Sequence, residues 1–426
     1  MARAAAVIVV VVLLGAAAAP AVAGEPDPTA PVYEVALTGS ERGMRWKGRE
    51  TISFTNPGAA PLDRIWIRLW GNGGLGCRGM RHVRIANLTG ATAGAPRVFC
   101  SAVPLRLATP LAPGARGFVA FDVVLRVPAR PGRFGRRGNL ALLSNAIPVL
   151  AHLEAGAWRL DRYFPIGEAW TYPAADWTVR LDPPPGVSVA APGVPQPDGS
   201  RRLERGRDYS FAAGRLRARR ATVDGVAVTV WAPRGRRGAP LATVMRITRR
   251  RLPRLSALFG PYGWPDLQIV VTDDALMEHT GLIMTSPDDW VITHELAHEW
   301  WYALVGNDQA AAPWLDEAFA SYAEEASGAQ DRPWCRRAGR GARLVTRGTA
   351  HFREREFRGY DRIYSEGACL LDLLRERIGR DSFRDALREY ALVNRYGWST
   401  AAEFRAAMDA VSPVPLGDLW RRYRVR

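Results

Sequence analysis

The 426-residue sequence has one lysine, four cysteines, six histidines and one long apolar run. The single lysine is Lys47, so arginine supplies 57 of the 58 basic residues. One apolar run excludes a multi-span membrane protein, since each spanning helix needs about 20 apolar residues. Glycine and proline make up about 17% of the residues, below the roughly 25–30% typical of disordered chains. With 47% hydrophobic residues, the composition indicates a globular protein of about two or three domains.

The apolar run opens the chain. Arg3 supplies a positive start, residues 4–19 are apolar except for one glycine, and Ala21-Val22-Ala23 ends in an Ala-x-Ala pattern. These features predict a signal peptide over residues 1–23, cut after Ala23. Such cleavage leaves no stable membrane span and predicts a secreted or extracytoplasmic protein of the cell envelope. The alternative is an uncleaved anchor, because the run approaches the length of a spanning helix.

The formal net charge of +16 is concentrated in several arginine clusters. A nucleic-acid-binding protein needs a recognition motif or interleaved aromatic residues as well, and the sequence has neither, so we expect no nucleic-acid partner. The clusters are interpreted as solvated faces, with weak attraction to an anionic envelope surface left open. They are Arg215, Arg217, Arg219 and Arg220; Arg234, Arg236 and Arg237; and Arg249, Arg250 and Arg251.

An even number of cysteines in an exported chain indicates disulfides. Pairing sequence neighbours predicts Cys77–Cys100 and Cys335–Cys369, one bond in each proposed domain. None of the four has the Cys-x-x-Cys spacing of a structural zinc site.

The sequence pattern changes from strands to helices part-way along the chain. Short strands bounded by Gly and Pro turns predict an antiparallel β module up to about Trp231. A mainly helical region with a small sheet, including a strand over residues 267–271, follows it. The sequence thus predicts an α+β multidomain protein with a β domain over residues 24–225 and a second domain over residues 226–426. The predicted helices cover residues 241–258, 289–304, 313–325, 363–378, 381–392 and 400–411.

The most specific motif is His294-Glu295-Leu296-Ala297-His298. Residues four apart lie on one face of a helix, so both imidazoles can bind one metal ion, and Glu295 can reach a water beside it. With six histidines in the chain, the motif is expected by chance on the order of 0.01 times. Its apolar neighbours predict a buried helix, in which two unpaired histidines are costly.

A hydrolytic zinc site needs a third protein ligand. After a spacer of eighteen residues beyond His298 comes Glu317, in Pro313-Trp-Leu-Asp-Glu-Ala-Phe-Ala-Ser-Tyr322. Pro313 fits the first turn of a helix, and the apolar residues around Glu317 predict that its carboxylate is buried. A metal ion compensates such a carboxylate, which makes Glu317 the candidate third ligand.

Together these residues resemble the aminopeptidase-N-like gluzincin zinc metallopeptidases. The resemblance extends to Met277-Glu278-His279-Thr280-Gly281-Leu282-Ile283, which is similar to the family's Gly-x-Met-Glu-Asn strand and the Gly-Leu-Ile after it. It also covers Tyr364-Ser365-Glu366-Gly367, which is similar to a Tyr-Glu-Lys-Gly segment. The resemblance implies a thermolysin-like catalytic domain after the β module. The chain ends about sixty residues past Tyr364, so we expect a short form without the family's C-terminal helical domain.

The resemblance also implies a role for each matching residue. His294, His298 and Glu317 hold one Zn²⁺ per chain, and Glu295 is the general base for a water that the zinc activates. Tyr364 donates its phenol proton to the oxyanion, and Glu278 binds the free α-amine of the substrate. Glu324, two helical turns beyond Glu317, either supports a ligand or is an ordinary surface acid.

The expected function is therefore an exported zinc aminopeptidase acting on peptides or proteins with a free N-terminus. Two alternatives stay open. A zinc endopeptidase is favoured by the missing C-terminal domain and by Ala275-Leu276, which replaces the family's Gly-x. A non-catalytic envelope-binding protein on the same fold is disfavoured because every ligand and the base are present. His279 replaces the family's Asn and is interpreted as a packed histidine rather than a substrate contact.

Overall fold

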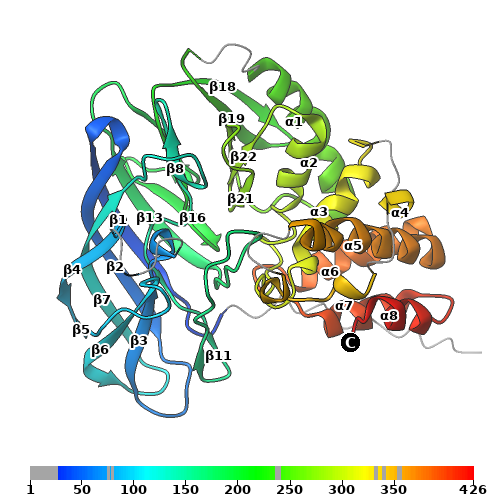
Figure 1. Cartoon of the computed structure of the whole chain (residues 1–426), viewed down its shortest axis with the longest axis horizontal. Helices are drawn as coiled ribbons and strands as arrows, with labels where there is room; N and C mark the ends of the chain where they lie inside the picture. The colour runs from blue at the N-terminus through cyan, green and yellow to red at the C-terminus, as the bar shows by residue number, and fades with distance from the viewer. Residues whose placement is uncertain are drawn as a thin grey trace, which may run out of the picture.

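The computed structural model describes residues 27–73, 77, 81–235, 241–330, 334–337, 342–352 and 357–426. The predicted signal peptide, residues 1–23, lies outside these residues. A β-rich N-terminal part lies beside a mainly helical C-terminal part (Figure 1). Within the described ranges, no helix has the length and apolar character needed to cross a membrane.

Four sheets of the described residues make up the N-terminal part. The largest has the strand order β15-β16-β13-β1-β2-β7-β4, and the others have the orders β10-β3-β6-β5, β14-β17-β9-β8 and β11-β12. The strands are β1 (Val32–Ser40), β2 (Arg45–Thr55), β3 (Leu62–Arg68), β4 (Val83–Thr89), β5 (Ala91–Ala93), β6 (Ala102–Leu111), β7 (Arg116–Arg126), β8 (Phe134–Arg137), β9 (Leu140–Leu143), β10 (Val149–Leu150), β11 (Leu153–Glu154), β12 (Ala157–Trp158), β13 (Ala175–Asp182), β14 (Ser188–Ala190), β15 (Val194–Pro195), β16 (Arg201–Gly206) and β17 (Phe211–Gly214).

The N-terminal sheets are not antiparallel throughout. β1 pairs with β13 in parallel, with Val35 opposite Val179, whereas β1 and β2 pair antiparallel. A parallel pair needs a long crossover connection. The chain provides one here, because it passes through the smaller sheets before it returns to β13. Period-two alternation buries Tyr33, Val35 and Leu37 of β1 on one face, as a strand with one face in the core requires.

The C-terminal part contains a five-stranded sheet in the order β18-β19-β20-β22-β21, as far as the described residues show. Its strands are β18 (Leu216–Val223), β19 (Val226–Pro233), β20 (Asp266–Val271), β21 (Met277–His279) and β22 (Leu282–Thr285). β19 pairs with β18 along its whole length and with β20. A division after residue 225 therefore cuts the β18–β19 hairpin, and we propose a domain boundary near Arg215 instead.

The helices follow the expected order with shifted ends. They are α1 (Leu241–Phe259), α2 (Asp289–Ala297), α3 (Trp314–Ala326), α4 (Trp334–Arg337), α5 (Phe357–Ile378), α6 (Arg380–Val393), α7 (Ala401–Val411) and α8 (Gly417–Tyr423), with short 3-10 turns η1 (Glu41–Gly43), η2 (Trp70–Asn72), η3 (Ala342–Leu344) and η4 (Thr349–His351). The helix expected over residues 289–304 ends early, at Ala297. The chain turns there, and Tyr302 has a φ of 145°, which an α-helix does not accommodate.

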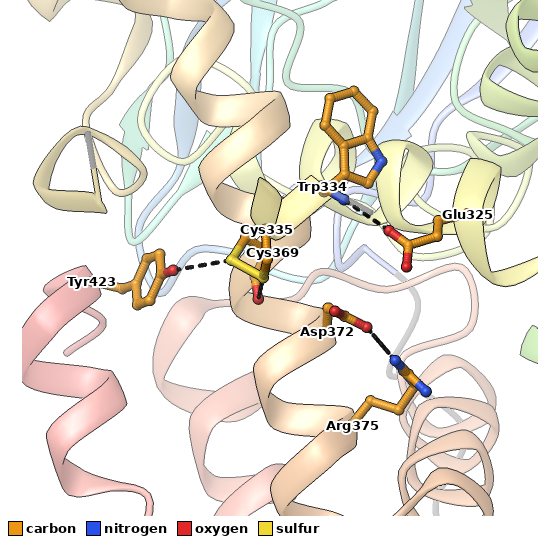
Figure 2. The surroundings of a disulfide bond; sticks show 7 residues. All are labelled: Glu325, Trp334, Cys335, Cys369, Asp372, Arg375 and Tyr423. Carbon is orange, nitrogen blue, oxygen red and sulfur yellow. Dashed lines mark hydrogen bonds and ion pairs between the residues drawn. A yellow bond between two sulfur atoms is a disulfide. The ribbon is translucent and has the colours of Figure 1, made fainter. Parts of the chain in front are cut away.

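Both predicted disulfides are present. Cys77–Cys100 lies in the N-terminal part, and Cys335–Cys369 joins α4 to α5. Around the second bond, the backbone N–H of Trp334 donates to Glu325 Oε2 of α3 at 2.9 Å, as Figure 2 shows. The Tyr423 hydroxyl of α8 lies 3.6 Å from Cys369 Sγ. The bond thus connects α4 to the helix that carries Tyr364.

Candidate functional site

Helices α2, α3 and α5 and strand β21 bring the predicted site residues together. Arg251 of α1 fixes the two metal-motif helices against each other. Its Nε donates to Asp289 Oδ1 at the start of α2 at 2.7 Å, and its Nη1 donates to the Ser327 carbonyl at the end of α3 at 2.7 Å. Asp289 also places a negative charge at the N-terminus of α2, which complements the helix dipole.

The three candidate ligands converge at one point. The ligand atoms of His294, His298 and Glu317 lie within 4.8 Å of one another, and all three residues are buried. Glu317 Oε2 lies 3.2 Å from His294 Nε2 and 3.4 Å from His298 Nε2. Two imidazoles and one carboxylate are a donor set that zinc takes in catalytic sites.

The Nδ1 atom of each of the two imidazoles already has a protein partner. His294 Nδ1 lies 2.8 Å from Glu324 Oε1, and His298 Nδ1 lies 3.1 Å from the Trp301 carbonyl oxygen. Contacts of this kind fix the ring orientation and turn Nε2 toward a metal. The residues present therefore fit a zinc ion, and Glu324 lies where a supporting carboxylate is expected.

The three candidate ligands shift one another's pKa values because they lie so close together. Burial lowers the pKa of His294, but hydrogen bonds with Glu317 and Glu324 outweigh it and hold that pKa well above its ordinary value. Burial likewise lowers the pKa of His298, yet its contact with Glu317 raises it to about 10. Burial raises the pKa of Glu317, whereas the two histidines hold it well below its usual range. A metal must displace protons from both Nε2 atoms to bind.

Glu295 and Glu278 lie close to His298. The ligand-type atoms of these three residues are also within 4.8 Å of one another. Burial raises the pKa of Glu295 to about 8, although His294 and His298 oppose the shift. Glu278 is on β21, the edge strand of the five-stranded sheet, and its Oε1 accepts from Gln309 Nε2 at 3.4 Å.

Tyr364 reaches the same point from α5. Its hydroxyl donates to Glu317 Oε1 at 2.7 Å, and its ring lies 5.8 Å from that of His294. The helix begins at Phe357 rather than near Ile363, so Tyr364 lies two turns inside it. Its phenol is therefore held beside the candidate metal position.

These residues line one cavity of about 690 Å³. All seven predicted site residues border it, and three exposed apolar side chains, Leu276, Trp290 and Phe357, border it as well. The volume lies in the range of small-molecule pockets.

Sequence reasoning missed four charged residues of this cavity, Arg133, Glu168, Asp361 and Arg362. Arg133, just before β8, donates through Nη1 to Glu168 Oε1 at 2.9 Å. Burial, followed by the charge of Glu278, raises the pKa of Glu168 well above its usual range, although Arg133 opposes the shift. Glu168 lies in the irregular stretch between β12 and β13, where no periodicity or motif marks it.

His279 does not line this cavity. It is buried, and its Nδ1 bonds to Asp208 Oδ2 of the segment between β16 and β17. The other oxygen, Asp208 Oδ1, accepts from the Thr280 backbone N–H at 3.0 Å. His279 is thus a packed histidine, and its contact ties β21 to the N-terminal part.

Known structures resemble the chain over nearly its whole length. An M1 zinc metallopeptidase from Deinococcus radiodurans matches with a TM-score of 0.66 and 22% identity, over 95% of this chain and 94% of that one. The chain has the two-domain fold of M1 zinc metallopeptidases. A mutant of the Deinococcus enzyme, with a TM-score of 0.65 and 22% identity over 93% and 94% of the two chains, is bound to a Tyr-Ser-Ala substrate.

Two relatives are similar to part of the sequence. Aminopeptidase N of Lactobacillus delbrueckii subsp. lactis is 23% identical over 249 residues, which are 49% of this chain and 30% of the relative. Tricorn protease-interacting factor F2 of Thermoplasma acidophilum is 24% identical over 208 residues, which are 40% and 27%. The matches thus span less than a third of each relative's length. No protein-family model matches the chain.

Proposed function

We propose that the chain is a zinc aminopeptidase, which hydrolyses the N-terminal peptide bond of peptides. The observation that supports this most is the convergence of His294, His298 and Glu317 beside Glu295 and Glu278 in one cavity. The tripeptide substrate in the Deinococcus neighbour supports peptides as the substrate class.

His294 Nε2, His298 Nε2 and a Glu317 oxygen would hold the zinc ion. When bound, zinc supplies Lewis acidity that makes water a nucleophile at neutral pH. The Glu295 carboxylate takes a proton from the attacking water and delivers it to the nitrogen of the leaving amine. The Tyr364 hydroxyl donates a hydrogen bond to the oxyanion that forms at the scissile carbonyl. Glu324 holds His294 in its binding orientation.

Glu278 binds the α-ammonium group of the substrate. Glu168 already pairs with Arg133 at 2.9 Å, so Glu278 is the carboxylate that we assign to that ammonium. This division of charge restricts attack to the first peptide bond, because an internal peptide bond brings no ammonium group to the buried Glu278 carboxylate.

The experiment is hydrolysis of short free-amine peptides by the zinc-loaded chain. We expect turnover in the parent chain and a loss of at least about a hundredfold in Glu295→Gln, since a base acting in the transition state contributes about 10²–10⁴-fold. The exposed Glu376→Gln of α5 is the matched control and should retain full activity. An active Glu295→Gln variant refutes the mechanism.

We further propose that the chain is exported. The features of residues 1–23 support this, and the two disulfides are of the kind that persists in oxidising compartments. Weak attraction of its arginine clusters to an anionic envelope surface is a separate proposal that rests on charge alone.

A further inference from the structure

Three exposed apolar side chains gather at the cavity. Leu276, Trp290 and Phe357 are 46%, 49% and 57% exposed, and all three line it. In the described part of the chain nine large apolar residues are at least 41% exposed, and three of these nine border this one cavity. We call these three residues the apolar rim. An apolar cluster of this kind beside a polar site marks a surface that a ligand covers.

Each rim residue is fixed relative to a residue of the site. Trp290 precedes His294 by one helical turn on α2, and Phe357 precedes Tyr364 by two turns on α5; both spacings keep the pair on one helix face. The Phe357 ring lies 6.4 Å from that of Tyr364. Leu276 is two residues before Glu278, about 7 Å along an extended chain.

Two arginines that line the cavity have carboxylate partners. Arg133 pairs with Glu168 at 2.9 Å, and Arg362 lies 3.7 Å from Glu366. Pro165 and Ile166 add apolar surface next to Glu168. A charged substrate side chain would compete with these ion pairs, whereas an apolar side chain would cover the rim and release its water.

We propose that the apolar rim is the subsite for the side chain of the substrate's first residue and selects large apolar residues such as leucine and phenylalanine. The amine and the side chain of that residue branch from the same Cα atom. An ammonium group at Glu278 therefore brings the side chain to neighbouring Leu276. The inference rests on the proposed function in this one respect, the position of the amine.

Binding and turnover test the inference separately. Calorimetric titration of the zinc-loaded chain with free L-leucine, L-phenylalanine, L-alanine and L-glutamate measures the subsite without catalysis. We expect the two large apolar amino acids to bind at least tenfold more tightly than alanine, because single methylenes in apolar pockets are worth about tenfold or more. Hydrolysis of matched Leu- and Ala-initiated peptides should show the same order in kcat/KM.

Substitutions in the apolar rim test whether these residues cause the preference for leucine over alanine. Leu276→Ser, Trp290→Ser and Phe357→Ser should each lower the leucine-to-alanine binding ratio at least threefold. The matched controls Leu392→Ser and Phe118→Ser, at 52% and 55% exposed sites away from the cavity, should leave it unchanged. Thermal melts verify that every variant is folded.

The outcomes separate the two proposals. Equal binding of leucine and alanine, or a leucine preference that survives all three rim variants, overturns the subsite and means that something other than substrate covers the rim. Rim-dependent leucine binding without peptide hydrolysis supports the subsite and overturns the aminopeptidase function. Binding of none of the four amino acids overturns the subsite.

Discussion

At the residue scale, each histidine of the candidate metal centre uses its Nδ1 atom for a protein contact. Glu324 contacts His294 at 2.8 Å, and the Trp301 carbonyl contacts His298 at 3.1 Å. The difference between the two contacts is chemical, since a carboxylate raises the basicity of its imidazole more than a carbonyl does.

Replacing Glu324 by glutamine should weaken zinc binding without abolishing it. We expect a 10–100-fold loss of affinity, the usual effect of removing a supporting carboxylate, measured by competition with a chelator of known affinity. Glu376→Gln, at an exposed site of α5, should bind zinc like the parent chain. An unchanged affinity in Glu324→Gln contradicts the supporting role.

Another buried carboxylate, Glu50, lies in the N-terminal part, on the interior strand β2. Both oxygens of Glu50 are buried without a hydrogen-bond partner among the described residues, and burial raises its pKa well above the ordinary value. The folded chain keeps this proton at pH values where the unfolded chain has lost it. Stability is therefore full below the unfolded pKa of about 4.5 and declines as the pH rises toward the folded pKa.

Glu50→Gln should remove this decline. We expect the variant to gain about 1–3 kcal/mol in free energy of unfolding relative to the parent on going from pH 5 to pH 8, since each pKa unit corresponds to about 1.4 kcal/mol. Urea unfolding of the metal-free parent and variant at both pH values measures this difference in free energy of unfolding. Glu34→Gln, exposed on the neighbouring strand, is the control. The same pH slope in Glu50→Gln and the parent argues against a buried protonated carboxyl.

At the scale of elements, hydrophobic periodicity predicts where helices lie, and the metal motif predicts which helices carry the ligands. The expected helix over residues 241–258 is α1, Leu241–Phe259, and the metal motif and its third ligand lie on facing helices. The pattern could not show where α2 ends, because the φ of Tyr302 depends on the packing around it. Nor could it find Glu168, whose place in the cavity comes from an irregular segment held by Arg133.

The Cys335–Cys369 bond joins two elements at the cavity (Figure 2). It closes a loop of 34 residues, for which chain entropy predicts about 3–4 kcal/mol of stabilisation. Cys335→Ala/Cys369→Ala should lose about that much in free energy of unfolding. It should also raise KM for peptides, because neighbouring Trp334 lines the cavity.

The other disulfide is the matched control. Cys77→Ala/Cys100→Ala opens a loop of similar length, 23 residues, in the N-terminal part, and should lower stability without changing KM. Equal effects of the two double variants on KM would show that the bond between α4 and α5 does not shape the cavity.

At the scale of the whole molecule, the buried Arg207 is among the residues that join the two parts. Arg207 is buried, and its guanidinium donates to the carbonyls of Tyr172 at 3.0 Å, Ala303 at 3.1 Å and Gly397 at 2.5 Å. A Cβ atom at Gly306 would lie 2.3 Å from its Cζ, so only glycine permits this approach. The sequence predicted two domains but not this contact, which joins residues up to 190 positions apart.

Arg207→Met should destabilise the chain by about 3 kcal/mol or more, because each buried carbonyl left unpaired costs about 1–3 kcal/mol. Urea unfolding measures the loss, and the exposed Arg202→Met should stay within about 0.5 kcal/mol of the parent. A parent-like Arg207→Met would mean that other contacts hold the two parts together.

The central claim is that Glu278 binds a free amine beside a zinc ion held by His294, His298 and Glu317. The most direct measurement compares one set of short peptides, each with a free and with an acetylated N-terminus. Mass spectrometry detects the products of the zinc-loaded chain, and Glu295→Gln serves as the blank. The account predicts stepwise release of single residues from the free peptides and no cleavage of the acetylated ones. Comparable cleavage of both forms contradicts it and identifies an endopeptidase.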